Sequence, residues 1–141
     1  MRLTSFTDYG LRALMRMAAA PGQVLSTAEL AAELRISRHH LGKIMQVLAR
    51  AGYVATRRGG GGGAMLARPA GEIRLGDLVR LLEQGQALVE CFAEGGGDCV
   101  LTGDCRLKHR LRAAEEGFLR DLNRSTLAQI AAPARGFALA E

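Results

Sequence analysis

The chain has 141 residues, of which 48% are hydrophobic and 4% aromatic, and it carries a formal net charge of +5 at pH 7. This length fits one domain with a short extension, and the absence of tryptophan predicts an aliphatic core. No apolar run reaches the ~18–20 residues of a membrane span, and the N-terminus lacks a signal-peptide core. We therefore expect a cytoplasmic protein without a membrane partner.

The charge is divided unevenly between the two halves of the chain. Residues 1–70 hold ten Lys and Arg against three acids, whereas residues 71–141 hold nine against eleven. A basic N-terminal half favours nucleic-acid binding at that end of the molecule only. A solvated surface with uneven charge is the alternative.

Two helices are predicted before residue 35. The first spans about residues 7–20, where apolar residues recur at helical spacing, and it ends at Pro21-Gly22. The second begins at the capping box of Ser26 and Glu29 and reaches Leu34.

A third helix is predicted over about residues 38–51, with Ser37 as its N-cap and Gly52 as its C-terminal cap. Its buried stripe consists of Leu41, Ile44, Met45 and Leu48. A short turn joins it to the second helix, and this arrangement is a helix-turn-helix.

A β-hairpin is predicted directly after the helix-turn-helix. Residues 53–56 and 64–67 have strand character, and between them lie Arg57, Arg58 and the five glycines 59–63. Five glycines also suit a flexible linker. The strand character of both flanks favours a hairpin, which at this position forms a wing.

Two further amphipathic helices are predicted, over residues 75 to about 85 and about 105–125. The second has a charged face and an opposite apolar stripe formed by Leu107, Leu111, Ala114, Phe118 and Leu122. An intramolecular core is one partner for this stripe, but few other apolar residues remain, so we expect a helix pair between the subunits of a homodimer. The predicted fold is mainly α with a small β-hairpin: a winged helix-turn-helix DNA-binding domain and a long C-terminal dimerisation helix.

DNA contacts are expected from the third helix, the wing and two helix starts. A recognition helix reads base edges mainly from its N-terminal turns, and arginine there can bridge guanine N7 and O6. Wing arginines reach phosphates or the minor groove, and threonines near helix starts add phosphate contacts. For any single basic residue a solvated charge is the alternative. The candidates are Thr7, Thr27, Ser37, Arg38, His39, His40, Lys43, Arg57 and Arg58.

Cys91, Cys99 and Cys105 are the chain's only cysteines and lie on a glycine-rich stretch. An odd number cannot all be paired as internal disulfides, and flexible backbone can fold around a metal ion or cluster. Their spacings differ from the paired C-x2–4-C pattern of structural zinc sites, which favours an iron–sulfur cluster. The source of a fourth ligand stays open, with candidates Asp98, Asp104 and His109 nearby and Asp8, His39 and His40 far away.

Other classes of protein explain less of the sequence. An electron-transfer iron–sulfur protein would account for the cysteines but not for the basic winged helix. A thiol enzyme would need a general base beside a cysteine, and His109 is the only nearby imidazole. We therefore expect no enzyme.

Four features together resemble one family. They are the opening MRLTSFTDYGLRAL, the segment SRHHLGKI that begins at Ser37, the glycine-rich wing, and three cysteines followed by Arg-Leu-Lys. The combination is similar to the winged-helix iron–sulfur transcription regulators over about residues 1–130. The N-terminal segment is most similar to the nitric-oxide-sensing repressors of that family.

The resemblance implies a cluster bound by Cys91, Cys99 and Cys105, with Asp8 of the other subunit as the additional ligand. A 4Fe–4S cluster is favoured over a 2Fe–2S cluster. It also implies a homodimeric repressor that binds palindromic operator DNA, loses it on reaction with nitric oxide, and so derepresses nitric-oxide detoxification genes. The expected organisation is residues 1–84 for DNA binding, 85–105 for the cluster-binding loop, 105–132 for dimerisation and 133–141 as a tail.

The chain departs from its relatives at four places. The segment between the first two cysteines has seven residues where five are common, and its glycines should absorb the difference. The wing tip is all glycine, and His39 stands where asparagine is common. A branch of the family that senses cluster status or redox state uses a histidine three residues after the last cysteine, where this chain has Lys108. A regulator of that kind is the alternative function.

Overall fold

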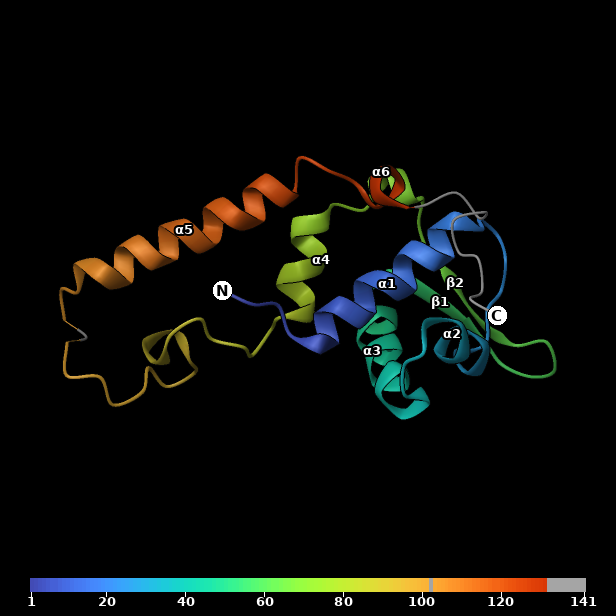
Figure 1. Ribbon diagram of the computed structural model, residues 1–141, viewed down its shortest axis with the longest axis horizontal. Helices are drawn as coiled ribbons and strands as arrows, with labels where there is room; N and C mark the ends of the chain where they lie inside the picture. The colour runs from blue at the N-terminus through green and yellow to red at the C-terminus, as the bar shows by residue number, and fades with distance from the viewer. Residues whose placement is uncertain (102, 132–141) are drawn as a thin grey trace.

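The computed structural model describes residues 1–101 and 103–131, so the expected tail at 133–141 lies outside the described residues. An N-terminal head carries the helix-turn-helix and hairpin, and α5 extends away from it (Figure 1). In chain order the elements are α1 (Ser5–Ala19), α2 (Thr27–Leu34), α3 (Arg38–Arg50), β1 (Val54–Arg57), β2 (Gly63–Leu66), η1 (Ala70–Glu72), α4 (Leu75–Leu82), η2 (Glu90–Phe92), α5 (Arg106–Leu122) and α6 (Leu127–Ile130).

The helix-turn-helix begins and ends where local chemistry predicts. Ser26 and Glu29 form the capping box of α2, and the Ser37 hydroxyl accepts a hydrogen bond from the His40 amide at the start of α3. Arg35 adopts a left-handed conformation, φ 55°, in the turn between the two helices. α1 begins two residues earlier than expected because Thr4 is its N-cap.

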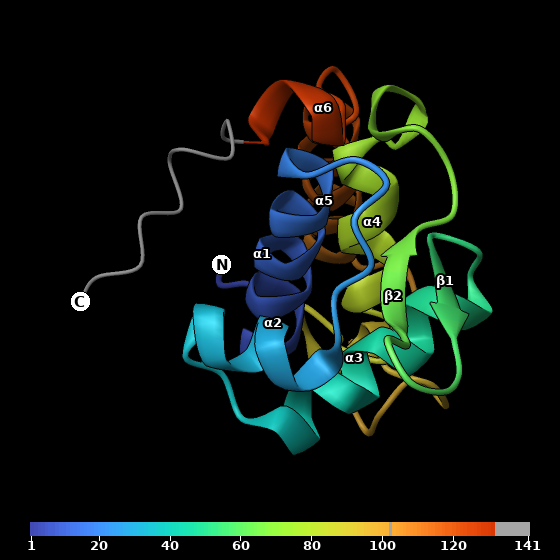
Figure 2. The same cartoon turned by 90° about the vertical axis from the view of Figure 1, so that its right-hand side faces the viewer.

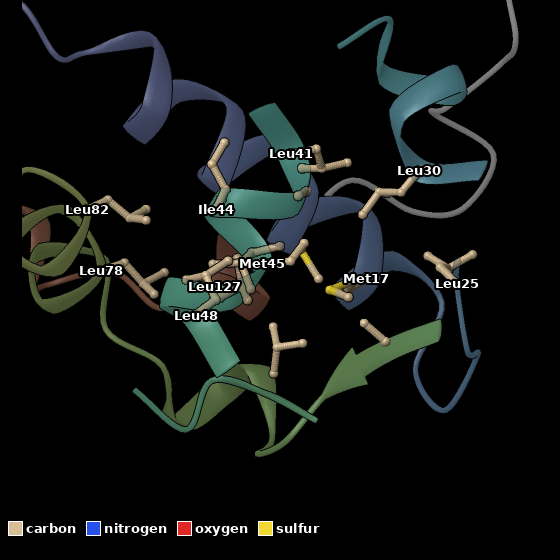
Figure 3. Packing of buried hydrophobic residues seen from close by; sticks show 14 of the residues in the cluster. Met17, Leu25, Leu30, Leu41, Ile44, Met45, Leu48, Leu78, Leu82 and Leu127 are labelled. Atoms are coloured by element: carbon tan, nitrogen blue, oxygen red, sulfur yellow. The ribbon is translucent and has the colours of Figure 1, made fainter. Parts of the chain in front are cut away.

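A single hydrophobic core lies around α1 and α3 and receives side chains from α2, the hairpin, α4 and α6 (Figure 3). The predicted stripe of α3 is confirmed, since Leu41, Ile44 and Leu48 are fully buried and Met45 is 5% exposed. Truncating one such buried leucine to alanine typically costs about 2–5 kcal/mol. The orientation of α3 on the head is therefore strongly determined.

The hairpin is confirmed as a wing. β1 and β2 pair antiparallel, with Val54 opposite Leu66 and Arg57 opposite Gly63, so each strand lies within one residue of its expected position. Ala64 also pairs with Leu25, whose carbonyl accepts the Ala64 amide at 2.7 Å. The hairpin stands beside α3 at the edge of the head (Figure 2). A Cβ at Gly63 would overlap the Leu25 carbonyl, so this approach requires glycine.

The C-terminal half of α5 packs on α4, and here the expectation needs a correction. Its buried side chain is Leu119, which does not belong to the predicted stripe. Glu116 belongs to the charged face of this helix, and it forms a salt bridge of 2.9 Å with Arg80 of α4. The N-terminal half of α5 stays open, because Leu107 is 65% exposed.

Residues 123–131 do not continue helix α5. They form a turn and the short helix α6, which packs against α1 and η1. Leu127 is fully buried, and its amide donates to the Ile73 carbonyl at 2.8 Å. A four-residue helix has no periodicity to reveal it, so α6 is not predicted from the sequence. The assignment of residues 105–132 to dimerisation stays a prediction.

No helix in the described part of the chain is long and apolar enough to cross a membrane.

Candidate nucleic-acid interface and cysteine loop

The outer face of α3 carries exposed basic side chains. Arg38, His39 and Lys43 lie within its first two turns and are exposed, as is the N-cap Ser37. The opposite face fills the core, so these side chains are held outward by the packing of α3. Such a surface can enter a major groove.

His40 faces α1 instead. Its ring centroid lies 5.3 Å from that of Tyr9 in an edge-on arrangement and 6.0 Å from that of Phe6. The side chain is half-buried. The structure therefore places His40 in the contact between α1 and α3, at the boundary of the exposed face.

The two predicted threonine contacts differ. Thr7 is fully buried, and its amide donates to the Thr4 hydroxyl. The Thr4 hydroxyl donates its hydrogen to the Glu83 carboxylate at 2.8 Å and lies 3.2 Å from the Thr7 hydroxyl. A phosphate cannot reach it, so the expectation for Thr7 is wrong. Thr27 is half-buried at the first position of α2, beside the N-cap Ser26.

Arg57 and Arg58 are exposed at the end of β1, where the hairpin enters its glycine tip. No salt bridge found among the described residues involves either of them. Exposed cations at this position can contact phosphates of a bound duplex, and this role of Arg57 and Arg58 stays a prediction.

The three cysteines are free thiols, each half-buried, along the segment that joins α4 to α5. The segment between Cys91 and Cys99 forms a closed turn, because the Glu90 carboxylate accepts a hydrogen bond from the Asp98 amide at 2.8 Å. Gly97 has φ +64°, and a Cβ there would overlap the Glu90 side chain. Glu90 thus connects the backbone next to Cys91 with the backbone next to Cys99, across a turn that contains Gly95, Gly96 and Gly97.

Cys105 is the N-cap of α5, and its sulfur accepts the Lys108 amide at 3.5 Å. Amides at a helix N-terminus favour a negatively charged ligand atom. The cysteine loop is also attached to α5 by Arg112, whose guanidinium lies 4.7 Å from the centroid of the Phe92 ring.

The donor set fits an iron–sulfur cluster by its chemistry, since three unpaired thiols on one loop are the ligand type that such clusters use. Within residues 1–101 and 103–131 of this single chain, no three His, Cys, Asp or Glu side chains are gathered closely enough to hold a metal ion. A complete site therefore requires the loop to contract or a second subunit to contribute.

Asp8 lies on the first turns of α1 and is paired with Arg12. Both carboxylate oxygens accept hydrogen bonds from the guanidinium, at 3.0 and 2.7 Å. Asp8 is 46% exposed, so it is accessible to a partner.

Two polar residues of these sites were missed from the sequence. Arg68 follows β2 and donates a hydrogen bond to the Gly52 carbonyl after the end of α3. Glu90 accepts the Asp98 amide within the cysteine loop. Val54 pairs with Leu66, and the same register continued by two residues places Arg68 opposite Gly52. The contact of Arg68 with the end of α3 could therefore be predicted once the strand pairing is known. Glu90 carries no sequence signal besides its place next to Cys91.

A winged helix-turn-helix that exposes basic side chains on its recognition helix and wing defines a DNA-binding transcription regulator. The family model of Rrf2, described as an iron-dependent transcriptional regulator, matches residues 3–133, and the chain belongs to this family. Its members are DNA-binding regulators and not enzymes.

Solved structures agree with this assignment. The chain is 26% identical to CymR, the global cysteine regulator of B. subtilis, with a TM-score of 0.73 over 93% of this chain and 96% of that one. The oxidised form of Staphylococcus aureus CymR is 27% identical, with a TM-score of 0.71 over 93% and 96%. T. potens IscR shares the fold, with 24% identity and a TM-score of 0.72 over 92% and 85%.

Proposed function

We propose that this chain is a homodimeric repressor of the NsrR type, which binds an iron–sulfur cluster and releases operator DNA in response to nitric oxide. The observation that carries the proposal is the placement of three free, half-buried cysteines on the loop that leads from α4 of the head to α5. A change in this loop acts on both elements.

The proposed ligands are Cys91, Cys99, Cys105 and Asp8 of the second subunit. A bound cluster would supply iron atoms that react with nitric oxide and thereby weaken the bonds to the protein. The chain's own residues prepare the site: Glu90 holds the loop between Cys91 and Cys99, and the N-terminus of α5 faces the Cys105 sulfur.

Asp8 is the preferred fourth ligand because of where it sits. It is exposed on α1, the helix that contacts the first turn of α3 through Tyr9 and His40. A bond from Asp8 to a site on the other subunit would therefore act close to the recognition helix. A carboxylate binds iron less tightly than a thiolate, which leaves this bond the easiest to lose.

Dimerisation is supported by apolar side chains of α5 that the single chain leaves uncovered. Leu107 in the N-terminal half is 65% exposed, and Phe118 in the C-terminal half lines a cavity of about 400 Å³ between α5, α4 and residues 1–4 instead of filling the core. An apolar helix face of this kind is typically covered by a symmetric copy. Two recognition helices would then enter successive major grooves of a palindromic operator, about 34–36 Å apart.

The alternative is a regulator of the IscR type that senses cluster status or redox state. It would use the same three cysteines with a different additional ligand. Lys108 stands where the histidine ligand of that branch is expected, and His109 is exposed one position further on. This difference favours the nitric-oxide sensor.

The test begins with anaerobic purification and assays of iron and acid-labile sulfide. Protein that carries only zinc and no sulfide would overturn the cluster. Holo-protein is then exposed in parallel to nitric oxide, oxygen and peroxide while its visible spectrum and its binding to operator DNA are followed. Loss of operator binding with nitric oxide, while binding persists in oxygen and in peroxide, supports the proposal. Loss of operator binding with oxygen or peroxide alone supports the alternative.

A further inference from the structure

Arg68 follows the wing and lies at the C-terminal end of the recognition helix. Its Nε and Nη2 donate hydrogen bonds to the carbonyl oxygens of Gly52 and Ala51, both at 3.3 Å. Ala51 is the C-cap of α3. The last carbonyls of a helix have no partner within the helix and carry partial negative charge, so a guanidinium satisfies both needs.

The same guanidinium stacks on the residue that connects α3 to β1. Its central carbon lies 4.3 Å from the centroid of the Tyr53 ring. Tyr53 is itself fixed by backbone hydrogen bonds, since its amide donates to the Leu48 carbonyl at 3.0 Å and its carbonyl accepts the Ala67 amide at 2.9 Å. Arg68 therefore joins the end of α3, the entry to β1 and the exit from β2 in one contact.

This contact matters because the rest of the wing has few constraints of its own. The tip between the strands is glycine from 59 to 62, without side chains to stiffen it. The base is fixed on one side by the pairing of Leu25 with Ala64. On the other side, Arg68 adds a polar side-chain contact with the end of the recognition helix to the apolar packing of Val54 and Ala64 in the core.

We propose that Arg68 is a positioning residue for DNA binding. It holds the wing at a set angle to α3, so that Arg57 and Arg58 meet the backbone of the same duplex whose groove α3 reads, and it does not itself contact DNA. A guanidinium can stack on a ring while donating two fixed hydrogen bonds, and a lysine ammonium cannot do both in this geometry.

The difference between arginine and lysine at position 68 makes the inference testable. Arg68→Lys keeps the charge and removes the contact, whereas Arg68→Gln removes both. Arg57→Lys and Arg57→Gln are the matched controls on the exposed face of the wing. Binding of full-length, anaerobically purified protein is measured over a range of salt concentrations, on a duplex selected by the wild-type protein from a randomised pool and on a mixed-sequence duplex of equal length.

For a positioning residue, we expect both Arg68 variants to bind the selected duplex about tenfold more weakly, a loss comparable to one base contact. Because a misplaced wing carries Arg57 and Arg58 away from the phosphates, both variants should also lower the slope of log affinity against log salt by about one to two units, although Arg68→Lys keeps its charge. Arg57→Gln should lower that slope by about one unit, and Arg57→Lys should restore it.

The opposite pattern overturns the inference. If Arg68→Lys binds like the wild type while Arg68→Gln lowers the salt slope by about one unit, then Arg68 is a phosphate contact. Wild-type binding by both variants would show that it has no role. Tyr53→Leu keeps Arg68 and its charge but removes the stacking surface, and it should reproduce both the weaker binding and the lower salt slope. Wild-type binding by Tyr53→Leu also contradicts the proposal.

Discussion

Asp8 and Arg12 lie one turn apart on α1 and form a bidentate salt bridge, with Nε 3.0 Å from Oδ1 and Nη2 2.7 Å from Oδ2. Both side chains are about half exposed, at 46% and 52%. An exposed pair at this spacing contributes only about 0.3–0.5 kcal/mol. A metal–ligand bond outweighs that amount, so the pairing leaves Asp8 free to serve as the proposed ligand.

Substitution of Asp8 tests this role. We expect Asp8→Ala to give anaerobically purified protein with a less stable cluster and an altered visible spectrum. Arg12→Ala should retain the wild-type spectrum, because it removes only a weak competitor for the carboxylate. Iron and sulfide content, with the absorbance spectrum, are the measurements.

Asp98→Ala and Asp104→Ala are the controls for the aspartate experiment, because these carboxylates lie within the cysteine loop and are the local candidates. An Asp8→Ala protein with an unchanged spectrum and an unchanged response to nitric oxide would remove Asp8 from the site. A spectral change in a loop variant alone would assign the ligand there.

Leu107→Glu should produce a monomer that remains folded. This leucine is 65% exposed in the single chain, so a charge there costs the fold little but opposes burial between subunits. Sedimentation equilibrium reports the mass and circular dichroism the helix content. Arg110→Glu, on an exposed part of the same helix, should remain dimeric; if Leu107→Glu also remains dimeric, the contact lies elsewhere.

Gly76→Ala should destabilise the protein by about 1–3 kcal/mol, in the range of overpacked interiors. A Cβ at this position would overlap the Leu119 carbonyl oxygen and lie 2.6 Å from the Asn123 Oδ1, so α5 would have to move away from α4. Urea unfolding measures the effect. Gly42→Ala in α3 is the control, because its Cβ meets open space and alanine is the better helix former by about 1 kcal/mol.

The contact between α4 and α5 should weaken in acid. A hydrogen bond from Arg80 lowers the pKa of Glu116 below its ordinary value of 4.5. A carboxylate whose pKa is lower in the folded state stabilises that state above the ordinary pKa, and the contribution is lost as the pH falls through the folded value.

The measurement for this pH effect compares the thermal midpoints of the wild type and Glu116→Gln. The wild type should be the more stable protein near neutral pH, and the difference should shrink as the pH falls below 4.5. Glu115→Gln is the matched control from the neighbouring position. A difference between wild type and Glu116→Gln that is constant across this range would show that the carboxylate charge contributes nothing to the contact.

Much of the head could be predicted from the sequence, because its signals are local. The capping box at Ser26 and the N-cap at Ser37 define helix starts through neighbouring atoms, and the stripe of α3 follows from helical periodicity alone. The wing could be predicted because strand-forming residues flank the glycines. The three cysteine donors required only the cysteine count, whereas Asp8 was suggested by the family resemblance.

The tertiary structure decided which side chains of those elements remain available. Thr7 and His40 are turned inward because α1 packs on α3, Arg68 reaches α3 because the hairpin folds back on it, and Glu116 pairs with Arg80 across 36 positions of the chain. Helical periodicity describes one element by itself, whereas these contacts depend on the relative placement of elements that are distant in sequence. Sequence therefore determined the parts and their chemistry, and packing determined which of those parts face DNA, the cysteine loop or the core.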